Sequence, residues 1–123
     1  MHAGAALRAG MGVAHAMAQA LGGRYGLPHG TMNAVCLPAA LRFNAEVAGE
    51  AIARLGEAIG AADPATRCAE LTGLFASPRL RDHGVPREDL PEVAAATAAR
   101  PAARGNPRAV GEAEALELLS EIW

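Results

Sequence analysis

The chain has 123 residues, of which 31 are alanine, 11 are arginine and none is lysine. Hydrophobic residues make up 51% of it, aromatic residues only 3%, and the formal net charge is -2. A length of roughly 100–150 residues is typical of one domain and is short for a complete enzyme that binds a substrate and a cofactor. The net charge predicts no nucleic-acid partner. No apolar run reaches the roughly 18 residues of a membrane span, so no membrane partner is expected.

Abundant alanine and few β-branched or aromatic residues predict an all-α fold, a bundle of about six helices. The first predicted helix covers residues 3–21. One of its faces carries Leu7, Met11, Ala14, His15 and Ala18. Gly10 and Gly12 interrupt this helix, which predicts a neighbour packed closely against its backbone. An ordered loop is expected over residues 22–30, because glycines and a proline crowd that stretch.

The second predicted helix begins at Thr31 as N-cap and kinks at Pro38. Its expected inner face carries Met32, Val35, Ala39 and Phe43. The third covers residues 45–59 and stops at Gly60. On it, we expect Ile52, Leu55 and Ile59 to point inward.

Asp63 and Pro64 predict the start of a fourth helix, as N-cap and first helical residue. One side of this helix carries Cys68, Leu71, Leu74 and Phe75, which are expected to be buried. Loops are expected over residues 77–86 and 101–107. A fifth helix is expected over residues 88–99 and a last one over residues 110–122.

Two of the four histidines stand out. His15 lies on the apolar face of the first helix, and His29 lies in the loop that returns from it. Two imidazoles brought together in this way form half of a site for a divalent metal. The alternatives are a core histidine bonded to a backbone carbonyl and an ordinary loop histidine. His2 is expected to be disordered at the terminus and His83 to be exposed in a polar turn.

Gln19 follows His15 by four residues and shares its helix face, so its amide could bond a ligand or substrate. The alternative is a polar residue at the helix rim.

Cys36 and Cys68 are predicted to be buried structural thiols rather than a disulfide framework. The first ten residues lack a signal-peptide pattern, which predicts a cytoplasmic location.

Several motifs resemble the iron-containing (group III) alcohol dehydrogenases. They are the run 12–23 with its histidine, Leu27-Pro28-His29-Gly30, the run 33–38, and Gly105-Asn106-Pro107-Arg108. The resemblance covers nearly all of the chain. It implies the dehydroquinate-synthase-like C-terminal helical domain, over residues 1–123, of enzymes that also have an N-terminal NAD(P)-binding domain.

In that family a divalent metal, iron or sometimes zinc, is held by an Asp and three His and polarises the oxygen of a small alcohol or aldehyde. The resemblance assigns two of those histidines to His15 and His29. The nucleotide domain and the helix with the other two ligands are absent from the sequence. Gln19 stands where many members have a second histidine that handles a proton. The chain is therefore expected to be inactive alone, and NAD(P) is expected only if a nucleotide-binding part, for example a separately encoded chain, is supplied.

Two alternatives stay open. The chain could resemble the metal-independent maleylacetate reductases, in which the histidine pair would bind a substrate carboxylate or transfer a proton. It could also be a non-enzymatic helical module that has kept the core pattern and lost the chemistry. A homo-oligomer is expected, because the surface that would meet the absent domain should leave an apolar patch uncovered. The residues expected in this patch are Met11, Met17, Tyr25 and Leu27.

Overall fold

The computed structural model describes the backbone of residues 3–123 and the side chains of residues 12–123, so His2 lies outside the described residues. Every regular element in the described part is a helix, which confirms the predicted all-α fold. The elements are α1 (Ala3–Tyr25), α2 (His29–Ile59), α3 (Pro64–Gly73), the 3-10 turns η1 (Leu80–His83) and η2 (Arg87–Asp89), α4 (Leu90–Ala98), α5 (Pro101–Arg104) and α6 (Glu112–Glu121). None of these helices is both long and apolar enough to cross a membrane.

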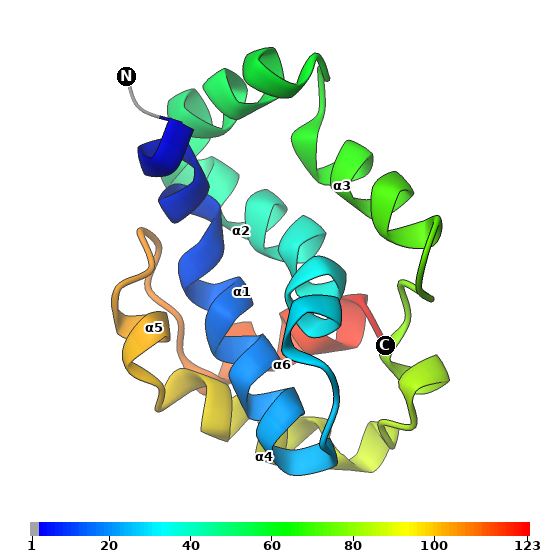
Figure 1. Cartoon of the computed structure of the whole chain (residues 1–123). Coiled ribbons are helices and arrows are strands. Elements are labelled where there is room, and N and C mark those ends of the chain that lie inside the picture. The colour runs from blue at the N-terminus through cyan, green and yellow to red at the C-terminus, as the bar shows by residue number, and fades with distance from the viewer. Residues whose placement is uncertain (1–2) are drawn as a thin grey trace.

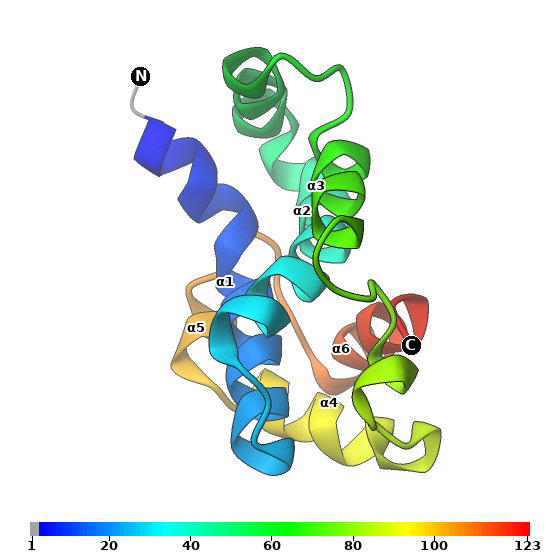
Figure 2. The ribbon, with the colours of Figure 1, turned by 45° about the vertical axis from the view of Figure 1, so that its right-hand side comes forward.

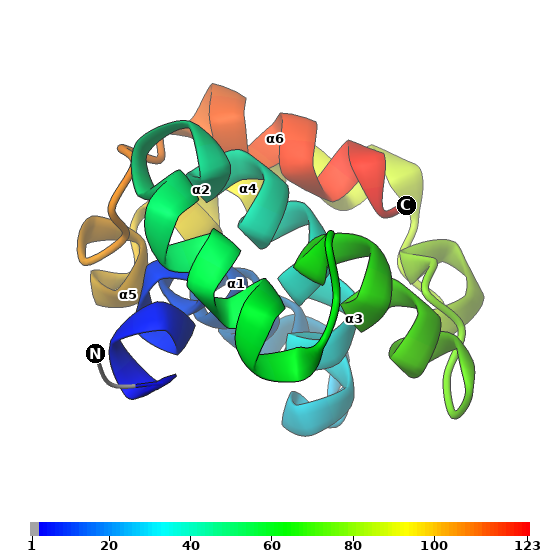
Figure 3. The same ribbon diagram turned by 90° about the horizontal axis from the view of Figure 1, so that it is seen from above.

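The two long helices α1 and α2 form the centre of the bundle (Figure 1). After Ala48 the chain rises with the second part of α2 and comes back down as α3 (Figure 2). Helices α4 and α6 pack on each other, and α4 and α5 pack on α1. Seen from above, α6 lies along one edge of the molecule and α3 along another (Figure 3). Neighbours thus hold α1 and α2, which carry the predicted site residues, in place.

One hydrophobic core joins α1, α2, α4, α6 and η1. Its fully buried side chains include Met17, Leu21, Met32, Leu80, Leu90 and Leu119. Burying each such side chain contributes roughly 1.5–3 kcal/mol. The predicted inner face of residues 32–43 is confirmed, because Met32, Val35, Ala39 and Phe43 are all buried. A smaller cluster of Leu41, Ile52, Leu55 and Ala65 joins α2 to α3.

The first helix is longer than predicted, because it continues through Gly22 and Gly23 to Tyr25. Two contacts hold its last turn: Arg24 pairs with Glu92, with 2.6 Å between Nη2 and Oε2, and the Tyr25 hydroxyl donates to Asp89 over 2.8 Å. Two helical glycines cost roughly 1–2 kcal/mol, which contacts of this kind and the buried core can offset. The expected loop over residues 22–30 is therefore reduced to residues 26–28.

The second and third predicted helices are one element, α2. It begins at His29 after Pro28, without a side-chain cap, so the predicted N-cap at Thr31 is wrong. The non-helical dihedrals inside α2 lie at Ala48 (φ -127°, ψ 26°), ten residues after the predicted kink at Pro38. The predicted stop is confirmed: Gly60 adopts the left-handed conformation at φ 70°.

The predicted start of α3 is also confirmed, because Asp63 caps it by accepting from the amide of Ala65 over 3.2 Å. Its predicted inner face is wrong. Leu71, Leu74 and Phe75 are 42%, 81% and 67% exposed, and Ile59 at the end of α2 is 43% exposed. The buried residues of α3 are Pro64, Ala65 and Thr72, and the hydroxyl of Thr72 donates to the carbonyl of Ala34 on α2 over 3.1 Å.

The apolar patch expected on α1 and the turn after it is wrong for Met17. Met17 is fully buried, and Tyr25 and Leu27 are half-buried against the core. The side chain of Met11 lies outside the described part.

The bounds of the last three helices are closer to the predicted ones. Helices α4 and α6 each begin two residues later than predicted, and the short α5 occupies part of the expected loop at 101–107.

Candidate metal centre

His15 and His29 lie next to each other, as the sequence predicted. His15 is in the middle of α1, ten residues before its end, and His29 is the first residue of α2. Gly26 turns the chain back at φ 67°, and its amide donates to the carbonyl of Gly22 over 2.9 Å. Residues 26–28 are the whole connection between the two helices, and the contact between the His15 and His29 rings shows that α2 begins beside α1.

The two imidazoles are 5.0 Å apart between ring centroids, with an interplanar angle of 86°. An imidazole nitrogen lies about 2.0–2.1 Å from a bound Zn²⁺, so the ring centres of two histidines on one tetrahedral ion lie roughly 5 Å apart. His15 is half-buried and His29 is exposed. The observed separation therefore fits two ligands of one divalent ion with one side open to the outside.

The two rings are not a complete metal site. No group of three or more His, Cys, Asp or Glu side chains that could hold a metal occurs among the described residues. Neither imidazole has a hydrogen-bond partner within residues 12–123. An ordinary core histidine would bond a backbone carbonyl, and His15 has no such bond within residues 12–123. A pair of this kind has its ring nitrogens available for a ligand.

Gln19 lies one turn after His15 on α1 and is half-buried. Within the described residues its amide makes no hydrogen bond with either histidine. The structure confirms where the side chain is, on the helix that carries His15. Its role stays a prediction.

The structure adds one side chain that sequence reasoning did not single out. Asn33 lies four residues after His29 on α2, and its Oδ1 is buried without a hydrogen-bond partner among the described residues. The only signal in the sequence was its place in the run that follows His29. A buried amide oxygen without a donor is uncommon in folded proteins and calls for a physical reason.

A pair of side-chain amides, Asn44 and Asn106, holds the site helices α1 and α2 together. Asn106 and Asn44 bond each other reciprocally, at 2.9 Å and 2.7 Å, inside the core. Asn106 Oδ1 also accepts from the backbone amide of Val13 over 3.1 Å, two residues before His15. A Cβ on Gly12 would lie 2.9 Å from the Cα of Asn106. The close neighbour predicted from this glycine is therefore the segment at Asn106, and it fixes α1 near His15.

The remaining candidates are not part of this site. His83 lies in η1 rather than in an open loop, and it is half-buried with its Nε2 2.8 Å from the carbonyl oxygen of Ser77, so its predicted exposure is wrong. Cys36 is buried, as predicted, and burial raises the pKa of its thiol to about 12. Cys68 is half-buried, and burial raises the pKa of its thiol as well.

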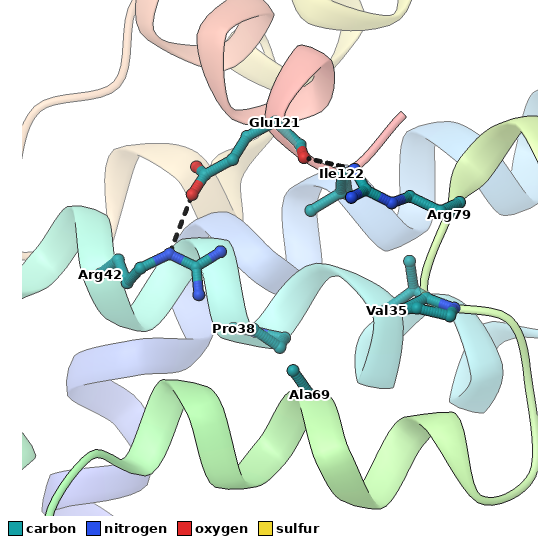
Figure 4. A pocket seen from close by; sticks show the side chains of 8 residues that line it. Val35, Pro38, Arg42, Ala69, Arg79, Glu121 and Ile122 are labelled. Carbon is teal, nitrogen blue, oxygen red and sulfur yellow. Dashed lines mark hydrogen bonds and ion pairs between the residues drawn. The ribbon is translucent and has the colours of Figure 1, made fainter.

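A pocket of about 220 Å³ lies between α2, α3 and the end of α6 (Figure 4). Its apolar lining residues include Val35, Pro38 and Ile122. At its rim, Arg42 donates to the Glu121 carboxylate over 2.8 Å. None of the predicted site residues lines it. The histidine pair is thus separate from this hollow.

Comparisons with known proteins agree with this fold. The chain is 34% identical to lactaldehyde reductase of Escherichia coli (strain K12), over 93% of this chain and 33% of that protein. It is 36% identical to maleylacetate reductase of Sphingobium indicum, over 86% of this chain and 30% of that protein. A crystal structure of a 1,3-propanediol oxidoreductase superposes with a TM-score of 0.80 at 33% identity, covering 90% of this chain and 32% of that one.

The chain thus spans about a third of the length of the curated relatives that it matches. A sequence model described as "Fe-containing alcohol dehydrogenase family, C-terminal" matches residues 1–123. The match covers both site histidines and the Asn44–Asn106 pair. The chain therefore belongs to the iron-containing alcohol dehydrogenase family and corresponds to its C-terminal domain.

Proposed function

We propose that residues 1–123 are the metal-binding helical domain of an NAD(P)-dependent alcohol or aldehyde oxidoreductase, with His15 and His29 as two of the metal ligands. The observation that carries this proposal is the pair of imidazoles, 5.0 Å apart and without hydrogen-bond partners within residues 12–123. A divalent ion such as iron or zinc would supply Lewis acidity, which polarises the oxygen of the substrate. The half-buried His15 and the exposed His29 would hold the ion at an open face.

The rest of the site has to come from other residues. Two imidazoles leave a tetrahedral shell half filled, and the sequence contains no glycine-rich phosphate loop. We propose that a nucleotide-binding part, on the same polypeptide or on a separately encoded chain, supplies the remaining ligands and NAD(P). Residues 1–123 alone would then bind metal weakly and would not catalyse hydride transfer.

Gln19 is proposed to act beside the metal. Its amide can donate and accept hydrogen bonds but cannot exchange a proton at neutral pH. We therefore assign it to holding a substrate or water molecule near His15, rather than to general acid or base catalysis. Its place one turn after His15 supports this assignment.

A metal-independent reductase is the second candidate, because the chain is as similar to maleylacetate reductase as to lactaldehyde reductase. In that case the histidine pair would bind a substrate carboxylate or transfer a proton. A cytoplasmic location is proposed in both cases, since the two free cysteines persist in reducing compartments. The homo-oligomer also stays a prediction.

A chimera tests the proposed function. The matching third of Escherichia coli lactaldehyde reductase would be replaced by this chain, and both lactaldehyde reduction and bound metal would be measured. We expect His15→Ala and His29→Ala to remove both, and Gln19→Leu to lower activity while metal stays bound. His83→Gln is the matched control, because His83 lies outside the pair, and it should change neither. Activity of the unsubstituted chimera without bound metal would favour the metal-independent candidate.

A further inference from the structure

The amide of Asn33 is the starting point. Its Oδ1 is buried and has no hydrogen-bond partner within the described residues. A buried acceptor without a donor costs free energy in the folded state. Such an atom in a native protein calls for an explanation, and a donor that reaches it in the working state is one.

The position of Asn33 narrows the choice of donor. Residues 29, 33, 36 and 40 form one stripe along α2, which runs from the exposed His29 to the buried Cys36 and Ala40. Residues four apart on a helix have Cβ atoms roughly 5–6 Å from each other. This spacing places the Asn33 amide within reach of the His29 ring on one side of α2.

The chemistry of a metal-bound histidine supplies the donor. A neutral imidazole that binds a metal through one nitrogen carries a proton on the other, and this N–H needs an acceptor. His29 has no such acceptor within residues 12–123, and Asn33 Oδ1 has no donor. One side chain thus lacks what the other offers.

We propose that Asn33 is a positioning residue for His29: its Oδ1 accepts the hydrogen bond from the ring N–H that points away from the metal. This bond fixes the tautomer and the orientation of the ring, so that the other nitrogen faces the ion. The inference rests on the proposed function, because it takes His29 to be a metal ligand. It assigns a role to a residue that touches neither substrate nor metal.

Asn33→Leu tests the inference with two readouts of opposite sign. The variant keeps the size of the side chain and removes the acceptor. Loss of such a supporting hydrogen bond lowers metal affinity by about 10–100-fold. The same change removes an unpaired polar atom from the interior, so resistance to urea should stay equal or rise. A residue with a merely structural role would lose stability along with affinity.

The experiment is a Zn²⁺ titration of the full chain, followed by the ¹H–¹⁵N signals of the histidine rings. We expect Asn33→Leu to weaken Zn²⁺ binding about 10–100-fold and to remove the preference of the His29 ring for one tautomer. Asn33→Asp retains an acceptor oxygen and should bind as tightly as the wild type or more tightly. Thr31→Val, a polar-to-apolar change in the same turn of α2, is the control and should leave Zn²⁺ affinity unchanged.

The outcomes separate the inference from the proposed function. If His29→Ala does not weaken Zn²⁺ binding, or if the wild-type chain binds no Zn²⁺, the proposed function is wrong and the inference falls with it. If His29→Ala removes binding while Asn33→Leu binds like the wild type, only the positioning role is wrong. An equal loss in Thr31→Val, or a drop in urea resistance in Asn33→Leu, would likewise overturn the role of Asn33.

Discussion

At the scale of single residues, Cys36 shows how burial changes a side chain's chemistry. The thiol lies in the main core, and desolvation raises its pKa from an ordinary value of 9.0 to about 12. A thiolate there would lose its hydration without gaining a cationic partner. The residue thus stays protonated at neutral pH and serves as a small hydrophobic side chain, as the sequence predicted.

This shift predicts a pH dependence of stability. Between pH 9 and 12 the unfolded chain loses the Cys36 proton while the folded chain keeps it, so stability is full below pH 9 and falls as pH rises. The slope should be at most about 1.4 kcal/mol per pH unit. Urea unfolding from pH 8 to 11 measures it, with Cys36→Ala as the reference, because the variant lacks this titration. Equal slopes in the two proteins would contradict the prediction.

The histidines show what residue-level reasoning can and cannot predict. His15 and His29 were identified because a polar ring on an apolar helix face, followed by another in the returning loop, is unusual. Their contact confirms the expected proximity. Asn33, Asn44 and Asn106 were not identified, because an asparagine gives no periodic signal and its partners can be far away in sequence. Asn44 and Asn106, for example, are 62 residues apart.

At the scale of elements, Gly12 marks the closest approach between α1 and the segment around Asn106. A Cβ added at Gly12 would lie 2.9 Å from the Cα of Asn106 and 3.1 Å from the carbonyl oxygen of Ala102. Both are backbone atoms, so neither can move aside easily. Gly10 and Gly12 predicted such a neighbour, but the sequence did not say which segment it is.

Gly12→Ala is therefore expected to destabilise the fold by about 1–3 kcal/mol, the usual cost of overpacking. Gly49→Ala is the matched control, since it is also a helical glycine and a Cβ there meets nothing within 4 Å. That change should instead stabilise α2 by roughly 0.5–1 kcal/mol. Urea unfolding of both variants checks the difference in sign. A neutral Gly12→Ala would show that α1 does not approach Asn106 this closely.

Helix boundaries were predicted well only where local chemistry decides them. Asp63 with Pro64 and the left-handed Gly60 are such cases, since caps act within one turn. The end of α1 at Tyr25 depends on Glu92 and Asp89, which are more than 60 residues away in sequence. In α3 the periodicity identified a face containing Leu71 and Phe75, but nothing local says whether another element covers that face.

At the scale of the whole molecule, the number of α-helices among residues 3–123 agrees with the prediction, but the chain is divided into them differently. Two predicted helices are the single α2, and a predicted loop contains α5. Alanine content and the spacing of apolar residues predict a helical bundle with one core. They do not give the crossing of α1 and α2, which places His29 beside His15. That crossing depends on the turn at Gly26 and on the Asn106 contacts.

The central claim is that His15 and His29 bind one metal ion together. The most direct test is calorimetric titration of the full chain with Zn²⁺, for the wild type, His15→Ala, His29→Ala and the double variant. Two ligands of one ion are strongly coupled, so each single change should remove binding and the double change should remove no more. The account predicts one weak site per chain that behaves in this way. Undiminished Zn²⁺ affinity in either single variant, or losses that add independently, would contradict it.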